Sequence, residues 1–259
     1  MQTTKDKITA IKEKGYNIDF SRVFENSFEN YKKIALIAGI TLILFSILIA
    51  IIAIAFIAVF WGFSSFNAET LGDYNPANFT FLHAILYVTF ISLLSGLASP
   101  FSAGFLKMAH CAAKGEDFSI GTAFDYYKSS HFKELFLAIF CISIWTIGLN
   151  TLLEFLGIRF IGAIITYIVS FFTFLTIPLI IFGNLNALEA IQGSFTIVSK
   201  QIFVLLGLLI VGIILVCLGL IGFCIGIFFT IPFMYSLYYC IYNDSIGIAD
   251  ENVVVTTIE

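Results

Sequence analysis

The chain has 259 residues, of which 59% are hydrophobic and only 12% are charged, and its formal net charge is −4. Soluble domains carry about 25% charged residues, and a soluble protein of this length cannot bury so much apolar surface in one core. The composition therefore predicts a membrane protein, and a net charge this small argues against nucleic acid as a partner.

Long uncharged runs locate the membrane segments. A helix rises about 1.5 Å per residue, so about 20 residues cross a hydrocarbon core of about 30 Å. Four runs are each long enough for one such helix, and a fifth, residues 201–243, is long enough for two. We therefore predict an all-α polytopic fold with six transmembrane helices, at about residues 34–60, 79–106, 135–155, 160–183, 202–219 and 222–242.

The break within the fifth run is placed at its glycines. Gly219 and Gly222 weaken a helix and permit a tight turn, whereas one long re-entrant segment is the alternative for this run. The predicted organisation is a cytosolic amphipathic segment over residues 1–33, a six-span domain over residues 34–243, and a cytosolic tail over residues 244–259.

The basic residues fall on one side of this six-span domain. Of the 13 Lys and Arg residues, only Arg159 lies on the opposite side. Loops rich in Lys and Arg face the cytosol. The pattern therefore predicts a cytosolic amino terminus, and an even number of spans returns the carboxyl terminus to the cytosol.

A weak threefold repeat divides the chain into units, each with an amphipathic segment followed by two spans. Late in the second span of each unit stands a proline: Pro100, Pro178 and Pro232. Proline removes a backbone hydrogen bond and clashes with the preceding turn, so it kinks a helix. The repeat therefore predicts three kinked hairpins. Neighbouring helices must satisfy the freed carbonyl oxygens in lipid, and the hydroxyls of Ser99, Thr176 and Thr230 lie close enough to help.

The amphipathic segments cover residues 19–33, 117–128 and 186–200. Their apolar residues recur at spacings of three and four, which places them on one stripe of a helix. We predict three amphipathic helices that lie in the cytosolic interface and lead each hairpin into the membrane. A solvated helical linker is the alternative interpretation.

Four stretches of the chain resemble a known family. They run from Asp19 to Lys33, from Gly104 to Gly115, from Glu189 to Phe195 and from Gly226 to Tyr242. The chain is similar there to a widespread family of bacterial six-helix integral membrane proteins of unknown function. These are related to the membrane domain of some glycerophosphodiester phosphodiesterases. The resemblance implies a six-helix fold in a bacterial cytoplasmic (inner) membrane. It implies no activity, because hydrolysis in the fused relatives belongs to a separate soluble domain.

Polar groups inside the predicted spans are scarce, so we predict no catalytic, cofactor-binding or metal-binding residue. The three histidines are divided between the two sides of the membrane, and a metal site needs several converging ligands. Glu154 and Arg159 flank the short outer turn after the third span, where we predict an ion pair. A gate for an ion or substrate is the alternative there.

Small residues let neighbouring helices approach closely. We predict packing roles for Gly96, Gly222 and Gly226, with a dimer seam as the alternative. Tyrosines at the end of the last span are interpreted as an interfacial belt: Tyr235, Tyr238, Tyr239 and Tyr242.

Two functions remain open. The absent polar site and the sparse outer face favour a non-enzymatic structural or accessory membrane component. Such a component would contact membrane lipids, and another membrane protein or a second copy of this chain. The three prolines at equivalent depth favour the alternative, a transporter or lipid-handling protein with a cavity between the hairpins. Neither function calls for a cofactor.

Overall fold

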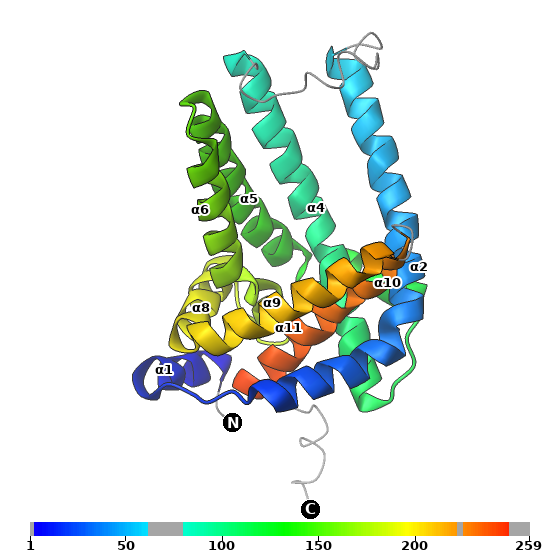
Figure 1. Cartoon of the computed structure of the whole chain (residues 1–259), viewed down its shortest axis with the longest axis vertical. Coiled ribbons are helices and arrows are strands. Elements are labelled where there is room, and N and C mark those ends of the chain that lie inside the picture. Colours follow the sequence, from blue (N-terminus) through cyan, green and yellow to red (C-terminus); the bar gives the residue numbers. More distant parts are fainter. Residues whose placement is uncertain (1–2, 62–79, 222–224, 249–259) are drawn as a thin grey trace, which may run out of the picture.

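The computed structural model describes residues 3–61, 80–221 and 225–248, and within them it contains helices and no strand (Figure 1). Two pairs of upright helices rise from a lower layer of shorter helices. The elements are α1 (Thr4–Lys14), α2 (Phe20–Trp61), α4 (Phe81–Lys114), η3 (Ile120–Lys128), α5 (Phe132–Phe155), α6 (Arg159–Thr173), α7 (Thr176–Ile181), α8 (Ala187–Lys200), α9 (Ile202–Leu218), η4 (Gly219–Ile221), α10 (Gly226–Thr230) and α11 (Pro232–Ser245).

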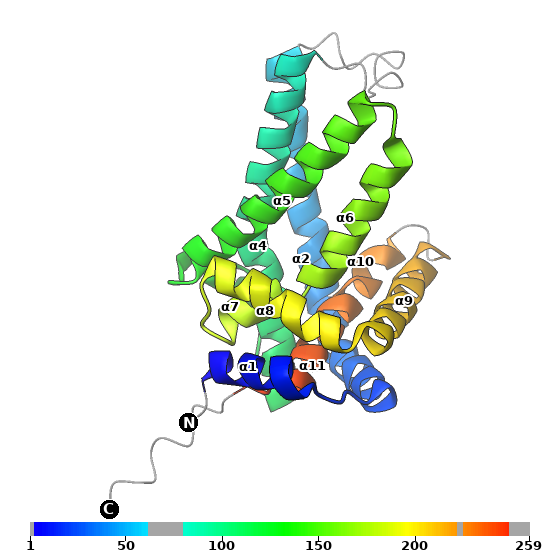
Figure 2. The same ribbon diagram turned by 90° about the vertical axis from the view of Figure 1, so that its left-hand side faces the viewer.

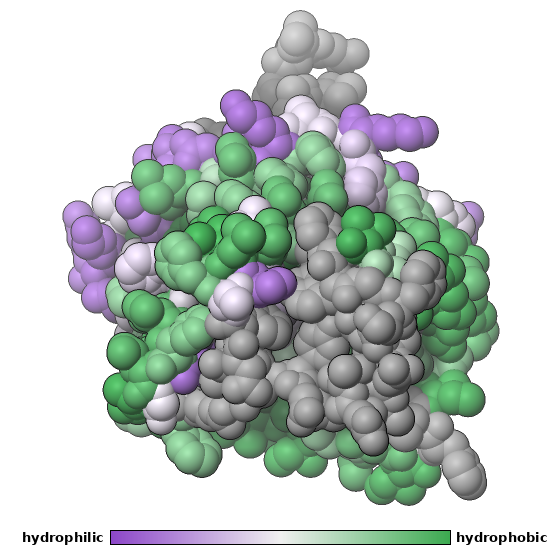
Figure 3. Space-filling model, turned by 90° about the horizontal axis from the view of Figure 1, so that it is seen from above, coloured by the Kyte–Doolittle hydropathy of each residue, from purple (hydrophilic) through white to green (hydrophobic). Residues whose placement is uncertain are grey.

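Five stretches in the described part of the chain are long and apolar enough to cross a membrane. They are Phe20–Ala55, Phe81–Lys114, Phe132–Phe155, Phe160–Ile181 and Ile202–Ile221. Large apolar side chains on them are exposed, among them Phe160 (87%) and Phe203 (89%). Seen from above, hydrophobic residues cover much of the flank of the molecule (Figure 3). These are the helices of a multi-pass membrane protein. Their outward apolar side chains are stable in the hydrocarbon core of a bilayer.

The predicted amphipathic segment and first span form one helix of 42 residues, α2. Its first part lies across the lower end of the molecule and its later part stands upright (Figure 1). Phe24 and Tyr31, on the apolar stripe of the first part, contact the ring of Phe233 in α11, with ring centroids 6.0 Å and 5.7 Å apart. Part of the predicted membrane-facing stripe therefore packs against protein.

The second hairpin of the prediction differs in detail from the structure. Residues 120–128 form the 3-10 helix η3 where we predicted an amphipathic α-helix. A Cβ atom on Gly104 of α4 would lie 2.3 Å from the backbone oxygen of Ala123 in η3. Glycine therefore allows η3 to lie directly on α4. The predicted fourth span is likewise divided into α6 and α7.

The third hairpin departs most from the prediction. The helix α9 ends at Leu218, close to the predicted break, but residues 222–224 lie outside the described part. The predicted sixth span is two helices, α10 and α11, which meet at Pro232. In Figure 1, α9 and α11 run obliquely across the lower half, and Figure 2 shows α5 and α6 rising above them. The described residues therefore do not form six upright transmembrane helices.

The buried core lies in the lower half of the molecule, where α4, α7, α8 and α11 meet. Phe105, Leu179, Ile197 and Phe233 belong to it, each at most 1% exposed. The core fixes the lower layer, while the upright helices turn most of their upper surface outward.

Candidate functional site

The proline of α4 lies inside a continuous helix. Pro100 has no N–H group, so the carbonyl oxygen of Gly96, four residues earlier, lacks its usual helical donor. The hydroxyl of Ser99 donates to that oxygen at 2.7 Å, and Ser99 is buried. Ser99 therefore has the role that the sequence predicted for it.

The other two prolines interrupt their spans. Pro178 lies in the first turn of α7, where its missing N–H breaks no helical bond. At the junction before it, the buried Ser194 hydroxyl of α8 donates to the carbonyl of Phe172 at 2.7 Å and accepts from the N–H of Leu175 at 3.2 Å. The hydroxyl of Thr176 has no partner among the described residues.

Pro232 is the first residue of α11, and Thr230 precedes it by two residues. Its hydroxyl donates to the carbonyl of Val216 in α9 at 3.0 Å, besides carbonyl oxygens of its own turn. The hydroxyl therefore joins the two arms of the third hairpin.

A cavity of about 370 Å³ lies beside all three proline segments. Helices α4, α5, α6, α7 and α11 contribute to its wall. Its lining residues are Ser102, Leu106, Ile139, Ile142, Ser170, Thr173, Phe174, Ile177, Ile231, Met234, Tyr235 and Tyr238. Ile177 and Ile231 directly precede prolines, and Ser102 follows Pro100 by two residues. Residues at or near all three prolines therefore line one cavity between the hairpins.

The cavity wall is apolar with neutral hydroxyls and carries no charged residue. The hydroxyls of Ser102 and Tyr235 lie 3.5 Å apart, and the ring of Tyr238 lies 5.1 Å from that of Phe174. Hydroxyls both donate and accept hydrogen bonds, whereas an isolated charge would lose its hydration here without a partner. The cavity is thus suited to an uncharged, mostly apolar group.

The cavity lies between two groups of helices. The helix α6 packs mainly against α5 and α8, and α11 packs mainly against α2, α4 and α9. Ser170 of α6 lines the cavity and is also exposed. The α6 side of the cavity therefore lies at the surface of the molecule.

A second, polar pocket of about 370 Å³ lies at the lower end between α2, α4 and α11. The sequence did not predict it, because its walls come from α2, α4 and α11, which lie far apart in the chain. Buried Asn30 forms its floor: the side-chain amide donates to the carbonyl of Ala109 at 2.7 Å, and its oxygen accepts from the Ser236 hydroxyl at 2.8 Å. Asp244 forms an ion pair with Arg22. Burial and the nearby Asp244 carboxylate raise the pKa of Tyr16.

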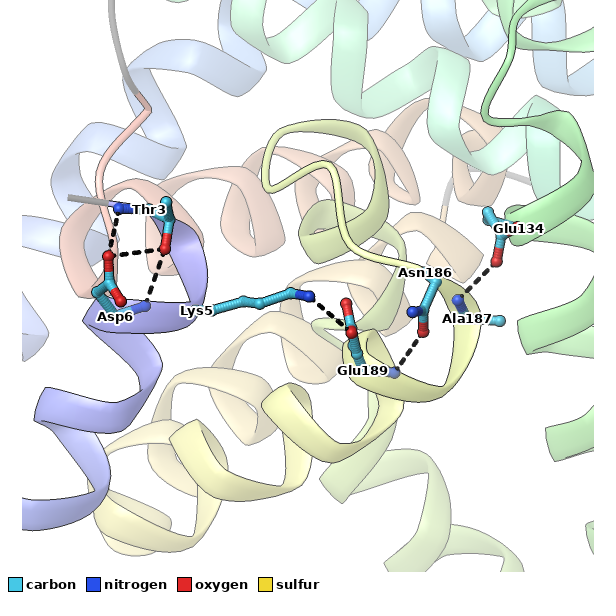
Figure 4. Close-up of polar contacts among 7 residues, drawn as sticks. All are labelled: Thr3, Lys5, Asp6, Glu134, Asn186, Ala187 and Glu189. Carbon is cyan, nitrogen blue, oxygen red and sulfur yellow. Dashed lines mark hydrogen bonds and ion pairs between the residues drawn. The ribbon is translucent and has the colours of Figure 1, made fainter. Parts of the chain in front are cut away.

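Polar contacts join α1, α5 and α8 at this same end (Figure 4). Lys5 donates to Glu189 at 2.7 Å, and this bond is the first cause that holds the pKa of the Glu189 carboxyl below its usual value. Asn186 caps α8 through the N–H of Glu189 at 2.9 Å, and Glu134 accepts from the N–H of Ala187 at 2.8 Å. The first contact joins α1 to α8, and the last joins α8 to the membrane helix α5.

Segments rich in basic residues gather at the lower end in Figure 1: α1, the first part of α2, the end of α4 and the end of α8. Four ion pairs occur among the described side chains, and each has its basic residue on α1, α2 or α4: Lys5–Glu189, Arg22–Asp244, Lys32–Glu29 and Lys107–Asp125. The predicted pair of Glu154 with Arg159 is not among them, because the Arg159 side chain lies outside the described part.

The predicted packing glycines lie at close approaches. A Cβ on Gly96 would lie 3.0 Å from the ring of Phe136 in α5, and one on Gly226 would lie 2.3 Å from the oxygen of Gly219. Gly222 lies outside the described residues.

The tyrosines at the end of α11 differ from the predicted belt. Tyr239 and Tyr242 are only 5% and 0% exposed, and Tyr235 and Tyr238 line the cavity. Apolar neighbours from other elements, not membrane lipid, cover two of the four.

The three histidines occupy separate places. The imidazole of His110 lies 3.3 Å from the Tyr239 hydroxyl, His131 lies 2.9 Å from the Asn184 side-chain oxygen, and His83 lies 2.5 Å from the Thr80 hydroxyl. In the described ranges no three His, Cys, Asp or Glu side chains come close enough together to hold a metal ion. Comparisons with models of known families, with curated proteins and with solved structures found no match to this chain.

Proposed function

We propose that this chain is a lipid-handling membrane protein that takes the uncharged part of an amphipathic lipid into the cavity between its hairpins. The observation that carries the proposal is the uncharged cavity of about 370 Å³ beside the three proline segments. Its volume falls in the range of about 300–1,000 Å³ that is typical of small-molecule sites. We infer that the exposed Ser170 of α6 marks the opening of this cavity toward the bilayer, where a lipid reaches it without crossing water.

The proposed ligand follows from the wall. Hydroxyls of Ser102, Thr173 and Tyr235 can hydrogen-bond an ester or hydroxyl group, and the surrounding aliphatic side chains can cover an acyl chain. We propose binding and not bond-making chemistry, because the wall offers neither a carboxylate nor an imidazole to act as a base.

Photo-crosslinking tests this proposal. The protein in nanodiscs is irradiated with a diacylglycerol that carries a diazirine in one acyl chain, and labelled peptides are mapped by mass spectrometry. We expect labels on α5, α6 and α11 around the cavity. Ser170→Phe narrows the opening and should lower this labelling by about tenfold. Ile164→Phe, on the outward surface of the same helix (56% exposed), is the matched control. Equal labelling of both variants and the parent would contradict the proposal.

A second candidate function is that of an accessory component, and one observation favours it. An apolar groove of about 640 Å³ lies between the upper parts of α4 and α5. Its floor includes small residues, Ala84, Gly148 and Thr151, which permit close helix approach. A transmembrane helix of a partner protein or of a second copy fits such a groove. Under this function, Gly148→Leu should abolish stoichiometric co-purification of that partner from mild detergent.

We further propose that both termini face the cytosol of a bacterial inner membrane and that the chain is related to the six-helix family that it resembles. The gathering of basic segments at the lower end supports the orientation. A cysteine introduced at Lys12, in a chain whose own cysteines are replaced, should react with a membrane-impermeant maleimide in inverted vesicles and not in intact cells. Reaction in intact cells would contradict the orientation.

A further inference from the structure

We propose that α8 lies in the plane of the lipid leaflet at the lower end of the molecule, with Leu188, Ile191 and Phe195 inserted at the boundary between head groups and acyl chains. The partner of this helix face is thus a phospholipid surface. The proposal does not depend on what the cavity binds, nor on which end of the molecule faces the cytosol.

The outward side of α8 is divided into an apolar and a polar strip. At about 3.6 residues per turn, Leu188, Ile191 and Phe195 follow one another along the helix and form the apolar strip. Leu188 and Phe195 are 64% and 55% exposed. Gln192, which is exposed, and Thr196, which is half-buried, lie on the neighbouring polar strip. A helix divided in this way suits an interface, because one strip meets lipid while the other meets water.

The opposite face of α8 is packed against the protein, and this packing fixes the direction of the apolar strip. Ala190, Ser194 and Ile197 are each 0% exposed. The Ser194 hydroxyl also bonds to both sides of the junction between α6 and α7. Rotation of α8 that turned Leu188 and Phe195 inward would therefore break these contacts.

Contacts with neighbouring elements show which strip faces the membrane. The ring of Phe195 lies 4.7 Å from that of Phe172 in α6, which belongs to the candidate span Phe160–Ile181. Glu189, on the polar side of α8, is paired with Lys5 of α1. The apolar strip therefore continues the apolar surface of a membrane helix, and the polar strip lies on the side of α1.

The chain on both sides of α8 sets its depth in the bilayer. The candidate span Phe160–Ile181 ends shortly before α8, and the candidate span Ile202–Ile221 begins just after it. Phe203, at the start of that second span, is 89% exposed. Figure 2 shows α8 running across the molecule below α6 and above α1. With 14 residues, α8 is too short to cross a hydrocarbon core, which takes about 20. A helix tied at both ends to membrane helices lies at the interface.

Tryptophan fluorescence in phosphatidylcholine vesicles tests the proposal. The two native tryptophans, Trp61 and Trp145, are replaced by Phe, and Leu188→Trp or Phe195→Trp is added to the full chain. Bromine on a lipid quenches a tryptophan that touches it. With phosphatidylcholine brominated near the glycerol, we expect emission from either variant to fall by at least about twofold, because an interfacial helix buries its apolar face about 5–10 Å deep. Bromine near the chain ends should quench less.

Two further variants calibrate the measurement. Gln192→Trp, on the polar strip of the same helix, is the matched control, and acrylamide in the water should quench it more than bromine does. Ile164→Trp, on the outward surface of α6 (56% exposed), should respond to bromine and shows that the protein is inserted.

Three outcomes overturn the proposal. Quenching of residues 188 and 195 by acrylamide and not by bromine would place the apolar strip in water. Quenching by neither would place it against protein, such as a second copy of the chain. Bromine quenching at residue 192 equal to that at residue 195 would show that α8 has no side turned toward the lipid.

Discussion

The hydroxyl of Ser99 donates to the carbonyl oxygen of Gly96 at 2.7 Å, and this oxygen is the one that Pro100 leaves without a backbone donor. The helix α4 is continuous over 34 residues, and this bond gives the carbonyl oxygen of Gly96 a donor at the proline. It also keeps a polar group satisfied in a helix that is apolar enough to span a membrane, where no water can replace the donor.

Replacement of Ser99 by Ala should lower the free energy of unfolding by about 1–2 kcal/mol, because a buried carbonyl then loses its partner. Ser95→Ala is the matched control. The Ser95 hydroxyl also donates to a carbonyl, that of Ile91, but this oxygen keeps its own helical N–H. In a Pro100→Ala background, Ser99→Ala should lower the free energy of unfolding by less, because the N–H of Ala at position 100 can then donate to the carbonyl of Gly96. Steric-trap unfolding in bicelles measures the free energy of unfolding of all four proteins in this double-mutant cycle. If Ser99→Ala lowers it equally in both backgrounds, the Ser99 hydroxyl does not replace the donor that Pro100 removes.

Replacement of Ser194 by Ala should destabilise the junction of α6 and α7. The hydroxyl satisfies two backbone groups there, the carbonyl of Phe172 and the N–H of Leu175. Loss of both bonds should lower the free energy of unfolding by about 2–3 kcal/mol. Ser199→Ala changes an exposed hydroxyl on the same helix and should alter it by less than about 0.5 kcal/mol. If the two variants unfold alike, the hydroxyl does not support the break.

Two glycines in long helices should respond to alanine in opposite ways. A Cβ at Gly104 would lie 2.4 Å from the Cα of Ala123, so Gly104→Ala must push η3 away from α4 and should cost about 2 kcal/mol or more. A Cβ at Gly148 would meet its nearest neighbour, Val88, at 3.7 Å, which is an ordinary contact. Gly148→Ala should therefore stabilise α5 by about 0.5–1 kcal/mol. Thermal unfolding in detergent measures both, and a shift of the same sign would contradict the packing.

Features set by local composition could be predicted from the sequence. The first three spans come from uncharged runs, and the structure has helices α2, α4 and α5 over them. The hydroxyl beside Pro100 was predicted because a freed carbonyl lies one turn earlier, within reach of that side chain. The continuity of α2 through Lys33 was not predicted, because the polar-to-apolar change there looks like a boundary although no helix breaker stands at it.

Features that depend on distant parts of the chain were missed. Asn30 reads as one polar residue among many, yet it contacts Ala109 and Ser236, which are 79 and 206 residues away. The sequence assigns Asp244 to the tail, yet its carboxylate forms an ion pair with Arg22 of α2. The oblique course of α11 likewise reflects its packing against α2 and α4, and α9 packs against α10 and α11; hydropathy records none of these contacts.

The contact between Lys5 and Glu189 should make the docking of α1 dependent on pH. The hydrogen bond from Lys5 lowers the pKa of the Glu189 carboxyl, so it stabilises the folded arrangement at pH values above the usual carboxyl pKa. The contribution is lost as the pH falls through the lowered pKa, because the carboxyl is then protonated. Lys5→Gln should raise the pKa of Glu189 toward its usual value and speed amide exchange in α1 at neutral pH.

The size of this effect is limited by solvent, since the side chains of Lys5 and Glu189 are 62% and 35% exposed. Exposed pairs contribute little, and Ile11 of α1, which is buried, should keep the helix docked in part. We therefore expect a change in α1 exchange and no change in the core helices. Lys12→Gln, on the same helix, is the control. Exchange in α1 that is equal for Lys5→Gln and Lys12→Gln would show that the contact with Glu189 does not hold α1.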